Sequence, residues 1–580
     1  MTERTENLSE RESAEVALPP ERETAEAVPA DAPEPAPAPA APAAAEAAPA
    51  RPAPPPFVPF PWWKGAIYAG SSVLLGLTQG LGLNLITANL TSLQAYFGAT
   101  QQEVSWLPAA YFATNMTGTL LMFKIRNQFG MRRFAEIGII VYVLLVIAHM
   151  FSNDLRSALV VRAMMGVAAA PLSTLAFFYM LEWLPPAKKM TVGICFGMIG
   201  NSLALPLARV ISPQLMQIGE WHGLYLVEAG LALIALAVIF LVPISHPPRV
   251  KSFDKDDLIS FPLLAAGFGT IAIVLSMGRT YWWFEAPWLG VLTAIGIASF
   301  VALGLVELHR RSPMIDLKWL LTPDMLTFTG ALIAVRILLS EQSVGAVGLF
   351  TVLGLGNDQM VPLFVIISVV TFGATYWLTT VLQPQRTPYL HLLALSMVAV
   401  AAWMDGHSSV LSRPEQFYLS QALMGFASAI FLPPAMLQGF GRAMAKGPQY
   451  ILSFLTVFLT TQSLGGLLGS ALMTTFVTIR EQFHSNVLAQ GVSLLDPLVA
   501  QRVQAYGGAY SKVLTDPALR DAKGLALLGQ SATQQANVLA YNDLFMVIFV
   551  ATLATIAVLL FHLALGALKK RAPQAQAKPA

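Results

Sequence analysis

The chain has 580 residues, of which 55% are hydrophobic and only 12% are charged. About a quarter of the residues of soluble proteins are charged, so this composition excludes an ordinary soluble domain and indicates extensive contact with lipid. The net charge of +2, without a basic patch interleaved with aromatic residues, argues against nucleic acid as a partner.

Residues 1–60 are unlike the rest of the chain. They are rich in Ala, Pro and Glu and show no apolar periodicity. Such a segment buries too little apolar surface to offset the entropy lost on ordering, so we expect a disordered cytoplasmic tail. A docking role for its acidic residues is the alternative.

Stretches of about 20 apolar residues, long enough to cross a bilayer, follow one another from residue 65 onward. The predicted transmembrane helices lie near 65–90, 104–123, 134–152, 157–182, 190–213, 222–243, 258–278, 288–307, 326–350, 361–382, 389–404, 416–439, 451–479 and 541–567. Fourteen is an even number, so both termini lie on the same side.

Basic residues concentrate in the loops on one side of the predicted membrane. They include Arg132, Arg133, Lys188, Lys189, Arg310, Arg311 and Arg386. By the positive-inside rule these loops and both termini are cytoplasmic. The polar segment 480–540 lies on the opposite side, and it is long enough to form a pair of amphipathic helices.

No catalytic motif is present: the chain has no HExxH, no G-x-S-x-G, no Walker sequence and no CxxC. It is therefore not expected to be an enzyme or a P-loop ATP-driven pump. Its single cysteine, Cys195, excludes an intrachain disulfide and a Cys-based metal site. The eight histidines are scattered, so we expect neither a metal nor a cofactor.

Charged residues inside predicted spans are costly in lipid and are therefore candidate functional residues. Arg162 lies early in the fourth span, where snorkelling to the interface is the alternative. Arg209 and Glu228 lie at similar depth in the antiparallel fifth and sixth spans, so we expect them to form an ion pair. This pair is either structural or linked to gating and proton movement.

The ninth span carries Arg336 and Glu341 near its middle. Five residues correspond to a rotation of about 140° around a helix, so the two do not form an intrahelical pair. Each needs a partner elsewhere, and an irregular helix is possible here. Glu341 is the best candidate for a protonatable coupling site, and a buried pair that only holds helices together is the alternative.

The first span contains several polar residues among small ones. Carboxamide side chains such as those of Gln79, Asn84 and Asn89 bind substrate or bridge helices, so these residues are candidates for the substrate path.

The order of motifs resembles the EmrB/QacA-type fourteen-helix drug:proton antiporters of the major facilitator superfamily, over residues 65–568. GLNLITANLTSLQAYFGATQQEVSWLPAAY is similar to that family's LDxTIVNVALPxI…QWVxTAY stretch through Asn89, Trp106 and Tyr111. FKIRNQFGMRR is similar to its GxLaDrxGRR loop, and RAMMG matches RxxxG through Arg162 and Gly166. LAYNDLF, at the start of the last span, also looks like this family.

The sequence also departs from the family pattern at charged positions. Asn84 stands where the family has an aspartate in the first span. In the loop after the second span, Phe123 replaces the first glycine and Asn127 the aspartate. ARVISP around Arg209 replaces the GPxxGG element of the fifth span. These changes indicate a divergent member whose proton site has moved to Glu341 or to the Arg209 and Glu228 pair.

The resemblance implies an all-α polytopic membrane protein with the major facilitator fold. The expected parts are the tail 1–60, a six-helix bundle at 61–243, a linker with two extra helices at 244–318, a second six-helix bundle at 319–568 that includes a periplasmic loop at 480–540, and a cytoplasmic tail at 569–580. Substrate would bind between the bundles, which would rock to alternate access.

The resemblance also assigns roles to residues. Tyr111 joins Gln79, Asn84 and Asn89 as a candidate for the substrate path. A conformational gating loop would consist of Asn127, Gly130, Arg132 and Arg133, with Arg386 in the corresponding loop of the second half.

The implied function is proton-coupled export of small amphipathic or toxic molecules across the bacterial inner membrane. A periplasmic adaptor protein and an outer-membrane channel are the implied partners, with 480–540 as the docking surface. The alternatives are a narrow-specificity exporter or importer of one metabolite and, from another class, a non-transporting membrane receptor or scaffold.

Overall fold

The computed structural model describes residues 61–245, 253–310, 313, 315–447 and 450–571, and all elements within them are helical. The predicted tail at 1–60 lies outside the described residues. Among the described helices, thirteen segments are long and apolar enough to cross a membrane. The all-α polytopic fold expected from the sequence is confirmed.

The N-terminal half consists of the helices before residue 245. Its elements are α1 (Trp62–Ala88), α2 (Leu90–Phe97), α3 (Gln101–Val104), α4 (Trp106–Phe129), α5 (Met131–Met150), α6 (Leu155–Glu182), α7 (Pro186–Lys188), η1 (Lys189–Gly193), α8 (Ile194–Gly197) and α9 (Ile199–Leu241). Helix α9 contains one candidate span that ends at Ile218 and another that begins at Trp221.

Helix α4 corresponds to the predicted second span, although it is less apolar than the thirteen candidate spans. Asn115, Thr117 and Lys124 lie within it. Its 24 residues are nevertheless long enough to cross a bilayer at about 1.5 Å per residue. With α4, the described helices account for all fourteen predicted spans.

The two extra helices and the C-terminal half follow. The extra pair is α10 (Asp257–Met277) and α11 (Pro287–His309), joined through η2 (Trp283–Glu285). The C-terminal half contains α12 (Leu317–Leu320), α13 (Pro323–Leu338), η3 (Glu341–Ala346), α14 (Val347–Val352), α15 (Asn357–Val381), η4 (Pro384–Arg386), α16 (Thr387–Asp405), η5 (Pro414–Phe417), α17 (Tyr418–Lys446), α18 (Tyr450–Gln490), α19 (Pro497–Gly508) and α20 (Pro517–Arg571).

The ninth span is irregular where the sequence places Glu341. Helix α13 ends at Leu338, and η3 is a π-helix that begins at Glu341. A π-helical turn changes the direction of the following side chains relative to a regular α-helix. The sequence left an unwound helix open at this place, and the structure has a π-helical segment that begins at the charged residue itself.

Each half has its own apolar core, and the two halves also contact each other. In the seam between them, α9 packs against α15 and α4 packs against α18. Helix α10 covers the second contact: Ala113 and Met116 of α4, Ala272 of α10 and Leu467 of α18 belong to one apolar cluster. The extra helix pair therefore touches both halves of the protein.

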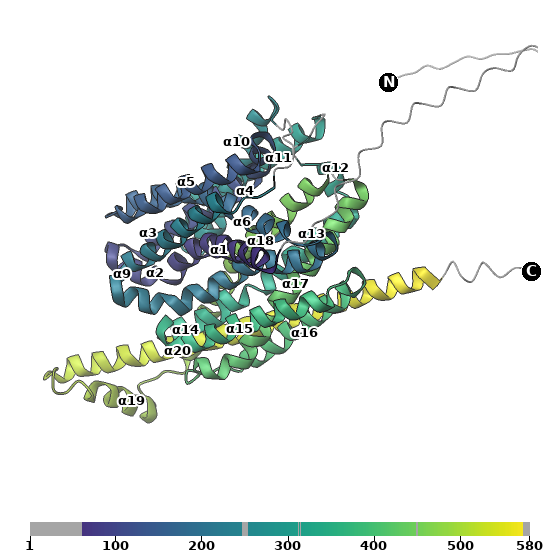
Figure 1. Cartoon of the computed structure of the whole chain (residues 1–580). Helices are drawn as coiled ribbons and strands as arrows, with labels where there is room; N and C mark the ends of the chain where they lie inside the picture. The colour runs from purple at the N-terminus through teal and green to yellow at the C-terminus, as the bar shows by residue number, and fades with distance from the viewer. Residues whose placement is uncertain (1–60, 246–252, 311–312, 314, 448–449, 572–580) are drawn as a thin grey trace, which may run out of the picture. The chain divides into compact units, whose positions relative to one another are not determined.

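The long polar segment after the thirteenth predicted span forms helices, as expected. Helix α18 extends to Gln490, and α19 lies beside the first part of α20 (Figure 1). We call this segment, residues 480–540, the arm. At its base, Arg480 donates to Asp543 Oδ2 at 2.6 Å, and His484 Nε2 lies 2.7 Å from the same oxygen. These contacts tie α18 to α20.

Close packing of α1 against α9 depends on two glycines that face each other. A Cβ atom at Gly200 would lie 2.9 Å from the carbonyl oxygen of Val73 and 3.0 Å from Cα of Gly76. Both are backbone atoms, so relief requires the helices to move apart. Side chains are therefore excluded at this crossing.

We predict that Gly200→Val destabilises the protein by about 1–3 kcal/mol because it overpacks the α1–α9 contact. Thermal unfolding in detergent measures the change. Gly230→Val is the matched control, since a Cβ at Gly230 has no atom within 4 Å. Equal melting temperatures for the two variants would contradict this account of the contact.

Candidate functional site

Arg162 of α6 is completely buried in the N-terminal half. Its Nη1 donates to the carbonyl oxygen of Gly82 in α1 at 2.9 Å, and its guanidinium carbon lies 4.7 Å from the centroid of the Tyr111 ring. Snorkelling to the membrane surface is not what the structure shows. Arg162 instead links α1, α4 and α6 inside the bundle.

Gly166, one turn after Arg162, allows α6 to approach α4 closely. Asn115 of α4 donates from Nδ2 to the carbonyl oxygen of Gly166 at 2.8 Å. A Cβ at Gly166 would overlap the backbone of α4 at Tyr111. The RxxxG element therefore contributes one buried cation and one close helix contact.

Glu228 of α9 is also buried, with 2% of its surface exposed. The hydroxyl of Tyr142 in α5 donates to its Oε1 at 2.8 Å. The sequence analysis did not identify Tyr142, because a tyrosine in an apolar span carries no signal of its partner.

The expected ion pair between Arg209 and Glu228 is absent from the contacts of the described residues. Arg209 points toward α15, where its Nη1 donates to Asn357 Oδ1 at 2.7 Å, whereas Glu228 points toward Tyr142 of α5. Equal depth in neighbouring helices is therefore not sufficient for pairing, because rotation about each helix axis directs the side chains to different neighbours.

Asn357 connects the two halves at the end of the membrane that is predicted to face outward. Its Nδ2 donates to the carbonyl oxygen of Ala88 at 2.8 Å and to Asn89 Oδ1 at 3.3 Å. Asn89 in turn donates to the hydroxyl of Ser212 at 2.7 Å. With Arg209, these residues join α1 and α9 of one half to α15 of the other.

The other candidates for the substrate path are arranged differently. Asn84 uses its Nδ2 to donate to Gly80 within its own helix at 2.8 Å. Gln79 of α1 and Tyr111 of α4 are both buried. Asn89 belongs to the contact between the halves.

Two carboxylates meet in the C-terminal half. Gln421 of α17 donates from Nε2 to Glu341 Oε1 at 3.2 Å and Oε2 at 3.4 Å, and to Asp405 Oδ2 at 2.8 Å. Glu341 is 0% exposed and Asp405 is 3% exposed. We call Glu341 and Asp405 the acid pair.

No lysine, arginine or histidine among the described residues forms an ion pair with either carboxylate of the acid pair. The predicted span 389–404 stops one residue before Asp405, which ends α16, and Gln421 lies near the start of the next span, so neither was identified from the sequence. A carboxylate and a carboxamide at the ends of consecutive spans are the only sequence signal of this contact.

Arg336 does not pair with Glu341, as the helical spacing predicted. Its side chain lies against α18, where a Cβ at Gly465 would be 2.9 Å from Arg336 Cβ and one at Gly466 would be 3.0 Å from its Nη2. These two glycines make room for the guanidinium group.

The predicted gating loop follows α4. Gly130 ends that helix with φ of 87°, a conformation that favours glycine. Arg126 donates to Asn127 Oδ1 at 2.8 Å, and Arg132 donates to Glu136 at 2.6 Å within α5. Arg133 also belongs to the first turn of α5, and Arg386 ends η4. Their role in gating stays a prediction.

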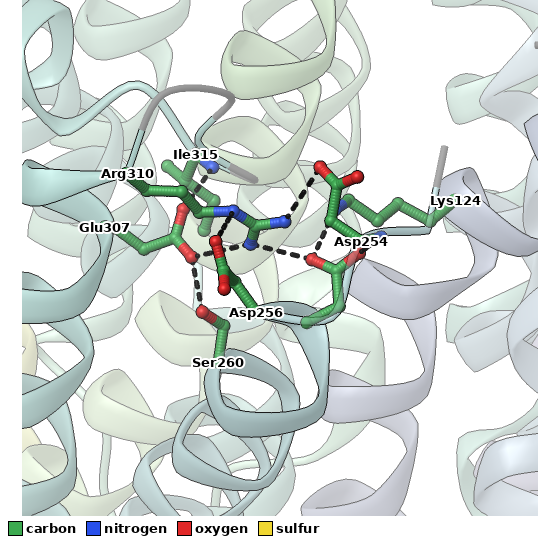
Figure 2. Close-up of polar contacts among 8 residues, drawn as sticks. Lys124, Asp254, Asp256, Ser260, Glu307, Arg310 and Ile315 are labelled. Carbon is green, nitrogen blue, oxygen red and sulfur yellow. Dashed lines mark hydrogen bonds and ion pairs between the residues drawn. The ribbon is translucent and has the colours of Figure 1, made fainter. Parts of the chain in front are cut away.

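A group of charged residues joins the same end of α4 to the extra helix pair (Figure 2). Asp257 of α10 pairs with Lys124 of α4 and, at 2.7 Å, with Arg310, which follows α11. Arg310 also lies 3.2 Å from Glu307, which accepts a hydrogen bond from Ser260. We call Lys124, Asp257, Glu307 and Arg310 the inner charge cluster.

The inner charge cluster is largely shielded from solvent: the exposed side-chain fractions are 2% for Arg310 and 8% for Lys124. The sequence analysis counted Arg310 only as a topological signal. Positive residues at a membrane boundary fix orientation whether or not they have partners, so counting them could not show this network.

A protein-family model described as Major Facilitator Superfamily matches residues 72–470. The chain belongs to the major facilitator superfamily. It is similar to the probable multidrug resistance protein EmrY of Escherichia coli, with 21% identity over 80% of this chain and 89% of the relative. The multidrug export protein EmrB of Escherichia coli is 19% identical over the same shares.

Among solved structures, a peptide transporter in complex with alafosfalin aligns with a TM-score of 0.52 and 12% identity. The alignment covers 72% of this chain and 88% of that chain. This structural similarity supports the all-α polytopic fold. The superfamily member is thus a divergent relative of the EmrB type, a multi-pass membrane protein and a secondary transporter rather than an enzyme.

We predict that Asp257→Asn destabilises this transporter by about 1.5–3 kcal/mol, because the variant loses the carboxylate that binds two buried cations. Scanning fluorimetry of the purified protein measures the resulting decrease in melting temperature. Asp256→Asn is the control, since Asp256 is 63% exposed and lies 3.8 Å from Arg310. An equal decrease in melting temperature in the two variants would mean that burial of the inner charge cluster does not contribute to the stability of the protein.

Proposed function

We propose that this transporter exports small amphipathic or toxic molecules in exchange for protons that enter the cell. The acid pair is the observation that carries the proposal. Two carboxylates share one neutral donor, Gln421, and both are buried within the C-terminal half. Two ionised carboxylates in such a place are costly, and a bound proton removes part of that cost.

The acid pair contains Glu341, the residue that the sequence favoured for coupling, and adds Asp405. Both belong to the half that lacks a fixed cation at this site among the described residues. Glu228 of the other half lies in the same bundle as the buried cation Arg162 and accepts a hydrogen bond from Tyr142. A proton that binds and leaves in each cycle is better accommodated at the acid pair than at Glu228.

The contact of Arg209 with Asn357 also takes part in the proposed transport cycle. It holds the two halves together at the end that is predicted to face outward. Opening toward the outside requires that hydrogen bond to break, so Arg209 and Asn357 act as an outer gate. The predicted orientation, with both termini in the cytoplasm, is part of this proposal.

The relatives support export as the direction of transport. EmrY and EmrB of Escherichia coli are described as a probable multidrug resistance protein and a multidrug export protein. The chain spans most of their length. We expect amphipathic substrates for this chain, because an apolar site with a few polar groups suits such compounds.

Glu341→Gln is expected to abolish efflux driven by a pH gradient, because the amide cannot take up and release a proton. Everted membrane vesicles loaded with an acridine pH probe report proton movement when a panel of amphipathic compounds is added. The control is Glu415→Gln in the exposed loop before α17. Normal proton exchange by a well-inserted Glu341→Gln protein would exclude coupling at the acid pair.

We further propose that α19 and the adjoining outer parts of α18 and α20 bind a periplasmic adaptor protein of a tripartite efflux system. The arm carries large apolar side chains on its surface, including Leu495, which is 94% exposed, and Leu498, which is 74% exposed. Apolar residues at that exposure are typical of a docking surface.

A photocrosslinking amino acid at Leu495 tests this interaction in intact cells. We expect it to capture a protein with one N-terminal membrane helix and a periplasmic domain, and Leu498→Asp to reduce the yield. The matched control places the crosslinker at Leu472, an exposed residue within the membrane-spanning part of α18. Crosslinks from Leu495 only to lipid or to the transporter itself would contradict the proposal.

A further inference from the structure

The fourth membrane span of each half presents one polar side chain at the same place. Arg162 is the eighth residue from the start of α6 at Leu155, and Gln421 is the eighth from the start of its candidate span at Pro414. Each donates a hydrogen bond to the first span of its own half. The two halves of a major facilitator protein are structural repeats, so these positions correspond.

The two corresponding residues differ in charge. Arg162 is a permanent cation, and it binds a backbone carbonyl of α1 at Gly82. Gln421 is neutral, and its single carboxamide nitrogen contacts both members of the acid pair. The half with the cation contains the buried carboxylate Glu228, whereas the half with the carboxamide contains two carboxylates.

Other titratable groups around the acid pair are already engaged or directed elsewhere. Asp543 of α20 is bound by Arg480 and His484. His407, two residues after Asp405, is exposed, and its Nδ1 lies 2.8 Å from the carbonyl oxygen of Trp403.

Two more groups lie on the elements packed against the pair. Arg336 lies against the glycines of α18, and Tyr541 of α20 packs against Gly348. Gln421 is thus the side chain that contacts both carboxylates.

We infer that Gln421 is a positioning residue that makes the C-terminal half the proton-coupling half of the transporter. The inference rests on the proposed coupling at the acid pair and adds to it the residue that sets the charge around the pair. The carboxamide holds Glu341 and Asp405 together without neutralising them. A cation at this position would hold both carboxylates ionised and prevent proton uptake.

The neutral charge of Gln421 affects proton binding at the acid pair in addition to its hydrogen bonds. A nearby cation favours the ionised form of a carboxylate, and at short distance it typically lowers the pKa by about 1–3. A shift of that size moves proton uptake out of the range in which a transporter operates. The corresponding cation in the other half, Arg162, is therefore expected to keep Glu228 out of the coupling reaction.

The test measures protonation without any transported substrate. Dicyclohexylcarbodiimide modifies protonated carboxyl groups in apolar surroundings, and mass spectrometry of the purified, full-length transporter locates the adduct. We expect labelling of Glu341 or Asp405 in the wild type to fall as pH rises. In Gln421→Lys the midpoint of this fall should move down by at least about one pH unit.

Two further variants separate charge from packing. Gln421→Leu keeps a side chain of similar length but removes the shared donor, so its labelling midpoint should move up rather than down. Gln416→Lys adds the same charge at an exposed position before α17 and should leave the midpoint unchanged. A purely structural role for Gln421 would lower the yield of folded protein in all position-421 variants without moving the midpoint in opposite directions.

The outcomes distinguish this inference from the proposed function. Unchanged midpoints in well-folded Gln421→Lys and Gln421→Leu proteins would overturn the inference, even if Glu341→Gln abolishes proton exchange. Proton exchange that survives Glu341→Gln would instead remove the proposed coupling site itself.

Discussion

The cost of burying charge in a membrane-spanning protein determines how this transporter is organised. Each buried ionisable group in its spans needs a partner, and the partners differ between the halves. In the N-terminal half, Arg162 and Glu228 lie in one bundle and bind a backbone carbonyl and a tyrosine hydroxyl. In the C-terminal half, Glu341 and Asp405 share the neutral donor Gln421. Under the proposed function, the charges of the N-terminal half stay fixed and the C-terminal half exchanges a proton.

The same principle accounts for the contacts between the parts of the molecule. At one end of the membrane, Arg209 of α9 uses Asn357 of α15 as its partner, and this contact joins the two halves. At the other end, Lys124 of α4 finds Asp257 of α10, and the inner charge cluster attaches the extra helices to the N-terminal half. Neutral hydrogen bonds such as Trp283 to Thr475 of α18, at 2.9 Å, connect the extra pair to the C-terminal half. An ionic attachment on one side and weaker polar contacts on the other would allow the halves to move relative to each other.

The sequence predicted the helical fold and the family, because apolar length is a property of single segments. It also singled out Glu341 from the cost of intramembrane charge, and the role of that residue stays a prediction. It could not predict which side chains meet. The pairing of Arg209 with Glu228 was wrong because depth along a helix says nothing about rotation around its axis. Asp405 and Gln421 were missed because they lie near a loop, where polar residues are expected. Their contact with Glu341 depends on the break after Leu338 and on how α16 and α17 pack.

The proposed function requires the acid pair to take up and release a proton. Infrared difference spectroscopy of the purified protein detects the carbonyl stretch of a protonated carboxyl group directly as pH is varied. We expect a band that weakens as pH rises in the wild type and is absent from the Glu341→Gln, Asp405→Asn double variant. A spectrum without such a band, or a band that persists unchanged in the folded double variant, would contradict the account.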